Sequence, residues 1–209
     1  MVISMLITEI NAVTKSRYKI VLEDNLHFVL YKGELQRFHL QQGQEITDDA
    51  YQKIMREILP KRARLRCMNL LKSKDYTKKQ LADKLREGGY PGAIIEDALA
   101  YVESYGYVDD ERYVREFIEY HMQSKSRKRI ENDLMKKGID RKLISGAFEE
   151  LQENGIEIDE TAMISKILLK KNYKGETATD EEKRKMYGFL YRKGFHTERI
   201  NQALLLDIT

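Results

Sequence analysis

Three short runs of lysine and arginine are the residues of this 209-residue chain whose spacing could support binding chemistry. The runs are Lys61, Arg62, Arg64 and Arg66; Lys125, Arg127, Lys128 and Arg129; and Lys183, Arg184 and Lys185. Clustered cations of this kind bind the phosphates of nucleic acids or the acidic surface of a protein partner. The alternative for any single run is a solvated helix face whose charge is balanced by nearby acids.

The regional distribution of charge favours the first run. The whole chain holds 37 basic and 34 acidic residues, a net charge of only +3. Residues 60–107 hold 10 basic and 6 acidic residues, a net charge of +4. The net charges of residues 1–59, 108–156 and 157–209 are −1, −1 and +1. A nucleic-acid role would therefore depend on local patches, with the best electropositive candidate in residues 60–107.

Tyrosines gather beside the first of these regions, at positions 101, 105, 107 and 113. Exposed aromatic rings can stack on nucleic-acid bases or anchor a protein interface. The interpretation that we favour is packing between helical units, with the hydroxyl groups reaching water or backbone.

Residues for catalysis or metal binding do not form a recognisable pattern. His27, His39, His121 and His196 lack metal-ligand spacing, and Cys67 lies in an amphipathic stretch typical of a buried thiol. Neither a Walker loop nor a G-x-G-x-x-G or G-x-S-x-G motif occurs. Asp109 and Asp110 precede a predicted helix and indicate a cap. We expect no enzyme, no cofactor and no metal site.

The general class follows from a few further features. A single cysteine excludes an intramolecular disulfide and fits a reducing compartment. No apolar run approaches the length of a membrane-spanning helix, and the N-terminus lacks the pattern of a secretory signal. We expect a cytoplasmic protein without a membrane segment.

The first 46 residues have the alternating pattern of β-strands. Residues 3–13, Tyr18–Leu22 and Leu26–Leu30 are the three expected antiparallel strands. A short helix over residues 33–40, stopped by Gly43, should follow.

From Thr47 onward the pattern is helical. Thr47 is a good N-cap for a helix that we expect to end at Pro60. A degenerate repeat then aligns on Gly89, Gly138 and Gly194. In each copy an apolar residue lies eight positions before the glycine, a leucine four before, an isoleucine six after and an alanine nine after. Each glycine should take the left-handed position that ends one helix before the next begins.

An earlier helix precedes each copy, over residues 63–71, 110–122 and 160–170. The last repeat ends on polar positions such as Asp207, as suits a terminal repeat. We therefore predict a mainly α fold with three tandem three-helix units in an elongated curved array, preceded by a small antiparallel β N-terminal region. The predicted boundaries are 1–46 for the β region, 47–107 for the first unit with its lead-in helix, 108–156 and 157–209.

The repeat and two local motifs resemble the RecX family of recombination regulators. The junction Tyr105-Gly106-Tyr107-Val108-Asp109-Asp110-Glu111-Arg112-Tyr113 is similar to the family's G-(aromatic or Leu)-(Val/Ile)-(Asp/Asn)-Asp-x-(Arg/Glu)-(Phe/Tyr) signature. Residues 125–130 resemble the basic start of the next helix, and residues 6–44 are similar to an extension of many Gram-positive members.

The resemblance implies a modulator of the RecA recombinase. It implies binding to the RecA filament on single-stranded DNA, and in most members restraint of strand exchange and ATP hydrolysis. The three basic runs are then the candidate contacts to the filament or to DNA. A helical repeat that binds nucleic acid directly, without a recombinase partner, is the second hypothesis, and a purely structural scaffold is the third.

Overall fold

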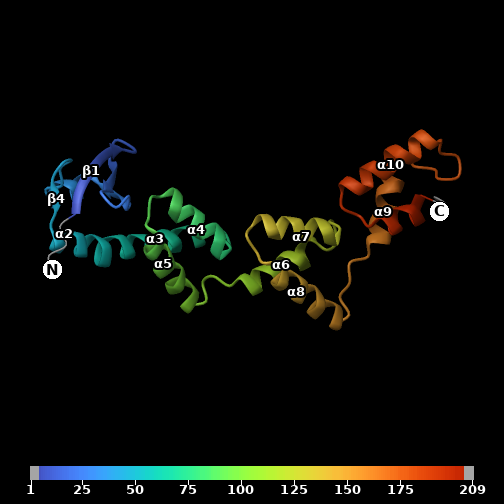
Figure 1. The fold of residues 1–209 in the computed structure, drawn as a ribbon. Coiled ribbons are helices and arrows are strands. Elements are labelled where there is room, and N and C mark those ends of the chain that lie inside the picture. The colour runs from blue at the N-terminus through green and yellow to red at the C-terminus, as the bar shows by residue number, and fades with distance from the viewer. Residues whose placement is uncertain (1–4, 205–209) are drawn as a thin grey trace. The chain divides into compact units, whose positions relative to one another are not determined.

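The computed structural model of the protein describes residues 5–204, and their contacts divide the chain into two units, Met1–Asp109 and Asp110–Thr209 (Figure 1). Each unit is described by itself. The mainly α fold with three tandem three-helix units behind a small antiparallel sheet is confirmed. The finer boundaries predicted at residues 46, 107 and 156 stay predictions.

An antiparallel sheet of four strands opens the first unit, in the order β3-β2-β1-β4. The strands are β1 (Met5–Ala12), β2 (Arg17–Leu22), β3 (His27–Tyr31) and β4 (Glu45–Ile46). The first three were predicted, although Ile3 lies outside the described residues. Strand β4 was missed because two residues are too few to show an alternating pattern.

The short helix after the sheet ends earlier than predicted. Helix α1 spans Lys32–Arg37, and His39 adopts a left-handed backbone with φ of 51°. Gly43 does not end this helix. Its N–H donates to the carbonyl of Ile7 at 2.8 Å, so Gly43 belongs to the turn that leads into β4.

The expectation that the next helix ends at Pro60 was wrong. The chain is helical from α2 (Asp48–Lys53) through the π-helical turn η1 (Ile54–Ile58) to α3 (Leu59–Leu71). Thr47 caps α2 as predicted, accepting a hydrogen bond from Ala50 N at 3.3 Å. The N–H of Leu59 donates to Ile54 O, five residues back, so the widened turn directly precedes Pro60. Such a turn accommodates the proline ring and its missing N–H.

Helices α4 (Lys78–Glu87) and α5 (Gly92–Ser104) complete the first three-helix bundle and pack on α3 (Figure 1). Thr77 and Gln80 form a capping box at the start of α4. Gly89 has the predicted left-handed backbone, with φ of +80°, and a Cβ there would collide with Val29 Cγ2 on β3. The sheet and the first bundle therefore share one hydrophobic core.

The second unit holds two further bundles. The second bundle consists of α6 (Asp110–His121), α7 (Arg127–Lys136) and α8 (Arg141–Glu153) around fully buried Ile130 and Leu134. Gly138 follows α7 with φ of +84°, as the repeat predicted.

The third bundle consists of α9 (Glu160–Lys170), α10 (Asp180–Arg192) and α11 (Thr197–Leu204). Gly194 has φ of +86°, and Leu190 and Ile200 of the repeat are fully buried. Asp207, predicted as a polar end of the repeat, lies outside the described residues. Within residues 5–204 no helix has the length and apolar character needed to cross a membrane.

Candidate functional site

The first basic run lies on α3, and two of its arginines hold the first unit together. Arg62 pairs with Glu34 of α1, donates to the carbonyl of Val29 at 3.1 Å, and lies over the ring of Tyr31. The Arg62 side chain is only 18% exposed. Arg62 therefore links α3 to strand β3 and helix α1.

Arg64 makes an equally specific contact on another side of α3. Its Nε and one terminal nitrogen donate to both carboxylate oxygens of Asp97 on α5, at 2.9 and 2.8 Å. The hydrogen bond to Asp97 raises the pKa of Arg64 above its ordinary value, with the charge of Asp97 adding to it. The guanidinium also lies 4.8 Å from the ring centre of Tyr101.

The other two cations of this run are exposed. In the part of the chain that the structure describes, neither Lys61 nor Arg66 forms an ion pair. Arg66 lines a pocket of about 380 Å³ between the sheet and α4, where Arg17, Tyr31 and Tyr90 also lie. Burial raises the pKa of Tyr90 in that pocket, although nearby Arg62 and Arg66 lower it. Two arginines of this run thus form ion pairs with other elements, and its other two cations are exposed.

The second run begins just before α7 and pairs within its own bundle. Arg127 Nε lies 2.9 Å from Glu131, four residues along the helix, and Arg129 Nε lies 3.4 Å from Asp133 in the same spacing. Lys125 contacts Asp133 at 2.9 Å. Lys125 lowers the pKa of Asp133, although burial of that carboxyl opposes it as the largest single influence. The Arg127–Glu131 pair is partly exposed and of i,i+4 spacing, and such pairs are weak in water, so Arg127 can exchange partners at low cost. Asp133 is mostly buried, so its pairs with Lys125 and Arg129 are better shielded from water.

Lys128 stands apart from these pairs. Among residues 5–204 it has no ion pair, and its ammonium lies 5.8 Å from the ring centre of Tyr191 on α10. The first turn of α7 therefore presents Arg127, Lys128 and Arg129 as exposed cations.

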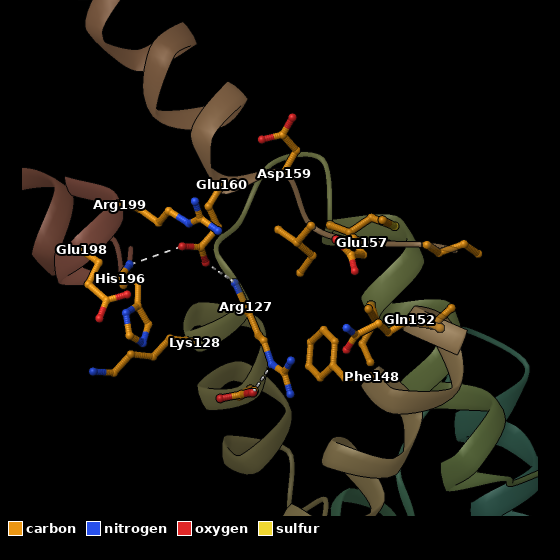
Figure 2. A pocket seen from close by; sticks show the side chains of 17 residues that line it. Arg127, Lys128, Phe148, Gln152, Glu157, Asp159, Glu160, His196, Glu198 and Arg199 are labelled. Carbon is orange, nitrogen blue, oxygen red and sulfur yellow. Dashed lines mark hydrogen bonds and ion pairs between the residues drawn. The ribbon is translucent and has the colours of Figure 1, made fainter. Parts of the chain in front are cut away.

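The same turn joins the second bundle to the third. Ser126 caps α7 by accepting from Arg129 N at 3.3 Å, and its Oγ donates to the carbonyl of Lys193 at 2.9 Å. Glu160 accepts from the N–H of Arg127 at 3.1 Å and from the N–H of His196 at 3.3 Å (Figure 2). One carboxylate thus bridges the starts of α7 and α11, where helix dipoles favour a negative charge.

A pocket of about 840 Å³ lies at this junction (Figure 2). Arg127 and Lys128 line it from α7, Phe148 from α8, and Arg199 from α11. Arg127 also lies 4.5 Å from the ring centre of Phe148. This junction was not predicted, because Ser126 and Lys193, like Arg127 and Glu160, are far apart along the chain.

The third run lies on α10. Lys185 pairs with Glu181 at 2.7 Å, both side chains being more than 70% exposed. Lys183 is half-buried and Arg184 is exposed, and neither forms an ion pair in the described part of the chain. Lys128 approaches this same helix at its other end, where Tyr191 lies six residues beyond Lys185.

Tyr101, Tyr105 and Tyr107 form a ring array in the first unit, with Tyr101 half-buried, whereas Tyr113 stacks on Phe117 within α6. Rings of Tyr101 and Tyr105 lie 4.9 Å apart, and those of Tyr105 and Tyr107 are stacked at 5.8 Å. Tyr105 is 60% exposed and Tyr107 is 48% exposed. Tyr101, the first ring of this array, is also the ring that Arg64 contacts.

Cys67 is buried, as its amphipathic stretch predicted. Burial raises the pKa of the Cys67 thiol to about 11, so the thiol stays protonated and unreactive at neutral pH. Across residues 5–204, no three His, Cys, Asp or Glu side chains gather where they could hold a metal ion.

Comparison with known proteins matches each bundle to a family domain. The first, second and third three-helix domains of RecX match residues 63–101, 109–147 and 158–204. The chain belongs to the RecX family. The regulatory protein RecX of Caldanaerobacter subterraneus subsp. tengcongensis is 33% identical over 97% of this chain and 100% of its own length. The regulatory protein RecX of Finegoldia magna is 28% identical over 87% of this chain and 89% of its own length.

Solved RecX structures share the fold. A crystal structure of regulatory protein RecX covers 96% of this chain, and this chain covers 98% of it, with a TM-score of 0.61 at 22% identity. The structure of RecX from Lactobacillus salivarius has a TM-score of 0.57 at 19% identity, covering 71% of this chain and 96% of its own. Membership in the RecX family supports a regulatory role and is consistent with a protein that is not an enzyme.

Proposed function

We propose that this protein binds the filament of the RecA recombinase on single-stranded DNA and lowers its ATP hydrolysis and strand exchange. The observation that carries the proposal is the presence of all three RecX three-helix domains in one chain. Because such a filament forms on cellular DNA, the proposal places the protein in the cytoplasm.

The first turn of α7 is the best supported contact surface. Arg127, Lys128 and Arg129 are exposed there, and their ion pairs are confined to Glu131 and Asp133 of the same helix. Among the described residues, the side chains of Arg127 and Lys128 contact other helices only through the rings of Phe148 and Tyr191, so these cations can turn toward phosphates or an acidic partner without breaking an ion pair between elements. Exposed Lys61 and Arg66 on α3, and Lys183–Lys185 on α10, are the further candidates.

The direct test measures ATP hydrolysis by RecA on single-stranded DNA as this protein is added. A saturable decrease in the rate is the expected result, because a regulator bound along the filament changes the state that hydrolyses ATP. An unchanged rate at saturating protein, with no binding to the filament, would overturn the proposal.

A second candidate function is direct binding of a nucleic acid without a recombinase partner. The observation that favours it is the exposed array of Tyr105 and Tyr107 beside Arg64 and Tyr101, because rings next to a cation can stack on bases. Anisotropy of a labelled oligonucleotide at several salt concentrations tests it. Tight, salt-sensitive binding without RecA, joined to an unchanged RecA rate, would favour this function over the first.

A further inference from the structure

The third bundle contains a second pocket, away from the junction with α7. It has a volume of about 550 Å³ and lies between the end of α9, the loop that follows, and α10. Its charged and aromatic lining is formed mainly by Lys171, Tyr173, Lys174, Lys185, Phe189 and Arg192. Only Lys185 of these belongs to the three basic runs of the sequence.

The backbone holds both walls in place. The N–H groups of Lys171 and Tyr173 donate to Ile167 O and Leu168 O, each at 3.0 Å, while Asn172 between them has a left-handed φ of 51°. These bonds close the end of α9 and fix the start of the loop. On α10, the spacing of Lys185, Phe189 and Arg192 places all three on one face of the helix.

The charge around this pocket is strongly positive. Four of the lining residues are cations and one, Glu182, is an acid. Glu182 already accepts from Thr179 N at 2.8 Å and Thr179 Oγ1 at 3.0 Å as part of the α10 capping box. Lys185 pairs with exposed Glu181. Lys171, Lys174 and Arg192 have no ion pair within residues 5–204, so three cations lack a counter-charge.

The aromatic groups indicate which ligand the pocket suits. The ring of Phe189 is in contact with two ammonium groups, those of Lys171 at 4.4 Å and Lys193 at 5.2 Å from its centre. A ring engaged in this way offers little surface to a stacking base. The Tyr173 hydroxyl is buried and has no hydrogen-bond partner in the described residues. Burial raises the pKa of Tyr173, with the charge of Glu182 adding to it, so this hydroxyl keeps its proton and can donate.

We propose that this pocket binds a phosphate group through Lys171, Lys174 and Arg192, with the Tyr173 hydroxyl as a further donor. Several cations and a neutral donor around one concave site match the oxygens of a phosphate. The phosphate can belong to a nucleic-acid strand or to a small phosphate compound. This site does not depend on a recombinase partner, because it would bind its ligand in the protein alone.

The test compares two charge-matched variants of the full chain. Lys171→Gln with Lys174→Gln removes two cations from the pocket, whereas Lys166→Gln with Lys170→Gln removes two exposed cations of α9 that do not line it. Pyrophosphate binding is measured by calorimetry, and binding of a labelled oligothymidylate by anisotropy at several salt concentrations. Melting curves of both variants establish that each is folded.

The pocket variant should bind at least one of the two probes about tenfold more weakly than the control variant. If the strand is the ligand, the pocket variant should also reduce the magnitude of the salt slope of oligothymidylate binding by about 0.7, the value for one phosphate contact on a single strand. Weakened pyrophosphate binding with unchanged oligothymidylate binding would assign the site to a small phosphate compound. Equal binding of both probes by the two folded variants, or no binding of either probe by the unaltered protein, would overturn the proposal. A failure of the RecA assay would leave these outcomes unaffected, so the two proposals fail separately.

Discussion

The basic runs on α3 and α7 are alike in sequence and different in what their charges do. On α3, Arg62 and Arg64 reach acids that lie 28 and 33 residues away in sequence, so their ion pairs join separate elements. On α7, Arg127 and Arg129 reach acids four residues away on the same helix. A long-range pair contributes to tertiary structure, whereas a pair within one helix leaves the cation available to a partner.

The largest effect should come from Arg62→Met. The substitution leaves the mostly buried Glu34 carboxylate without its cation and removes the donor to Val29 O. We expect the free energy of unfolding to fall by about 2 kcal/mol, less than for a fully buried pair because Glu34 keeps its bond to the Tyr31 N–H. The measurement is a urea unfolding curve, read at constant m-value.

Lys61→Met is the matched control, because Lys61 is the exposed neighbour on the same helix. Its effect should stay within about 0.5 kcal/mol. If the two substitutions lower the free energy of unfolding equally, the ion pair of Arg62 does not contribute more to stability than the exposed Lys61.

The second-largest effect is expected from the basic run on α7. Replacing Arg127, Lys128 and Arg129 together by glutamine should weaken binding to the RecA filament about tenfold, because three exposed cations are removed from one turn. The free energy of unfolding should change by less than about 1 kcal/mol, since Arg127 and Arg129 are partly exposed and the mostly buried Asp133 keeps its pair with Lys125. Filament binding is measured by anisotropy of the labelled protein, and stability by urea unfolding.

A triple variant at Lys136, Arg141 and Lys142, also to glutamine, removes the same charge from the same bundle. It should bind the filament nearly as well as the unaltered protein. If both triple variants weaken binding equally, the effect is one of overall charge and the first turn of α7 is not the contact.

The smallest effect is expected on the pKa of His121, the last residue of α6. Burial, and then the charge of Lys125, lowers the pKa of His121 from its ordinary value of 6.5. Because the folded state favours the neutral ring, stability from this group is present above about pH 6.5 and is lost as the pH falls toward the lowered pKa. Lys125→Gln should raise the pKa of His121 in an NMR titration, and Lys136→Gln should move it less. A pKa that both variants leave unchanged would show that Lys125 does not act on this ring.

Much of the helical fold could be predicted because its signals are local. The left-handed Gly89, Gly138 and Gly194 and the N-cap at Thr47 all formed as expected. Each is decided within about one helical turn, where backbone sterics and a single hydrogen bond dominate.

The misses have an equally physical origin. A proline normally ends a helix, but the π turn before Pro60 lets the helix continue, and packing of the buried residues Ile54 and Leu59 supports it. Strand β4 exists because its two residues pair with Met5 and Leu6 across the sheet. A long-range pairing of this kind leaves no periodic pattern in the strand itself.

The candidate binding residues were found by type and spacing, and their roles as contacts stay predictions. What could not be predicted was which of them are already engaged. Glu34 and Asp97 pair with two arginines of the first run, and no spacing rule connects those acids to α3. The pocket of the third bundle was missed for the same reason, because a loop and helix α10 separate Lys171 and Lys174 from Arg192 along the chain.

The sequence by itself determined the repeat, the left-handed glycines that end its helices, three of the four strands and the location of the basic runs, because these depend on neighbours along the chain. The tertiary structure alone decided which cations are engaged in internal pairs and which stay exposed, and which distant residues share a pocket. The physical reason is that an ion pair or a pocket depends on distance in space, which the chain sets only after its cores at Leu85, Leu134 and Leu190 have packed.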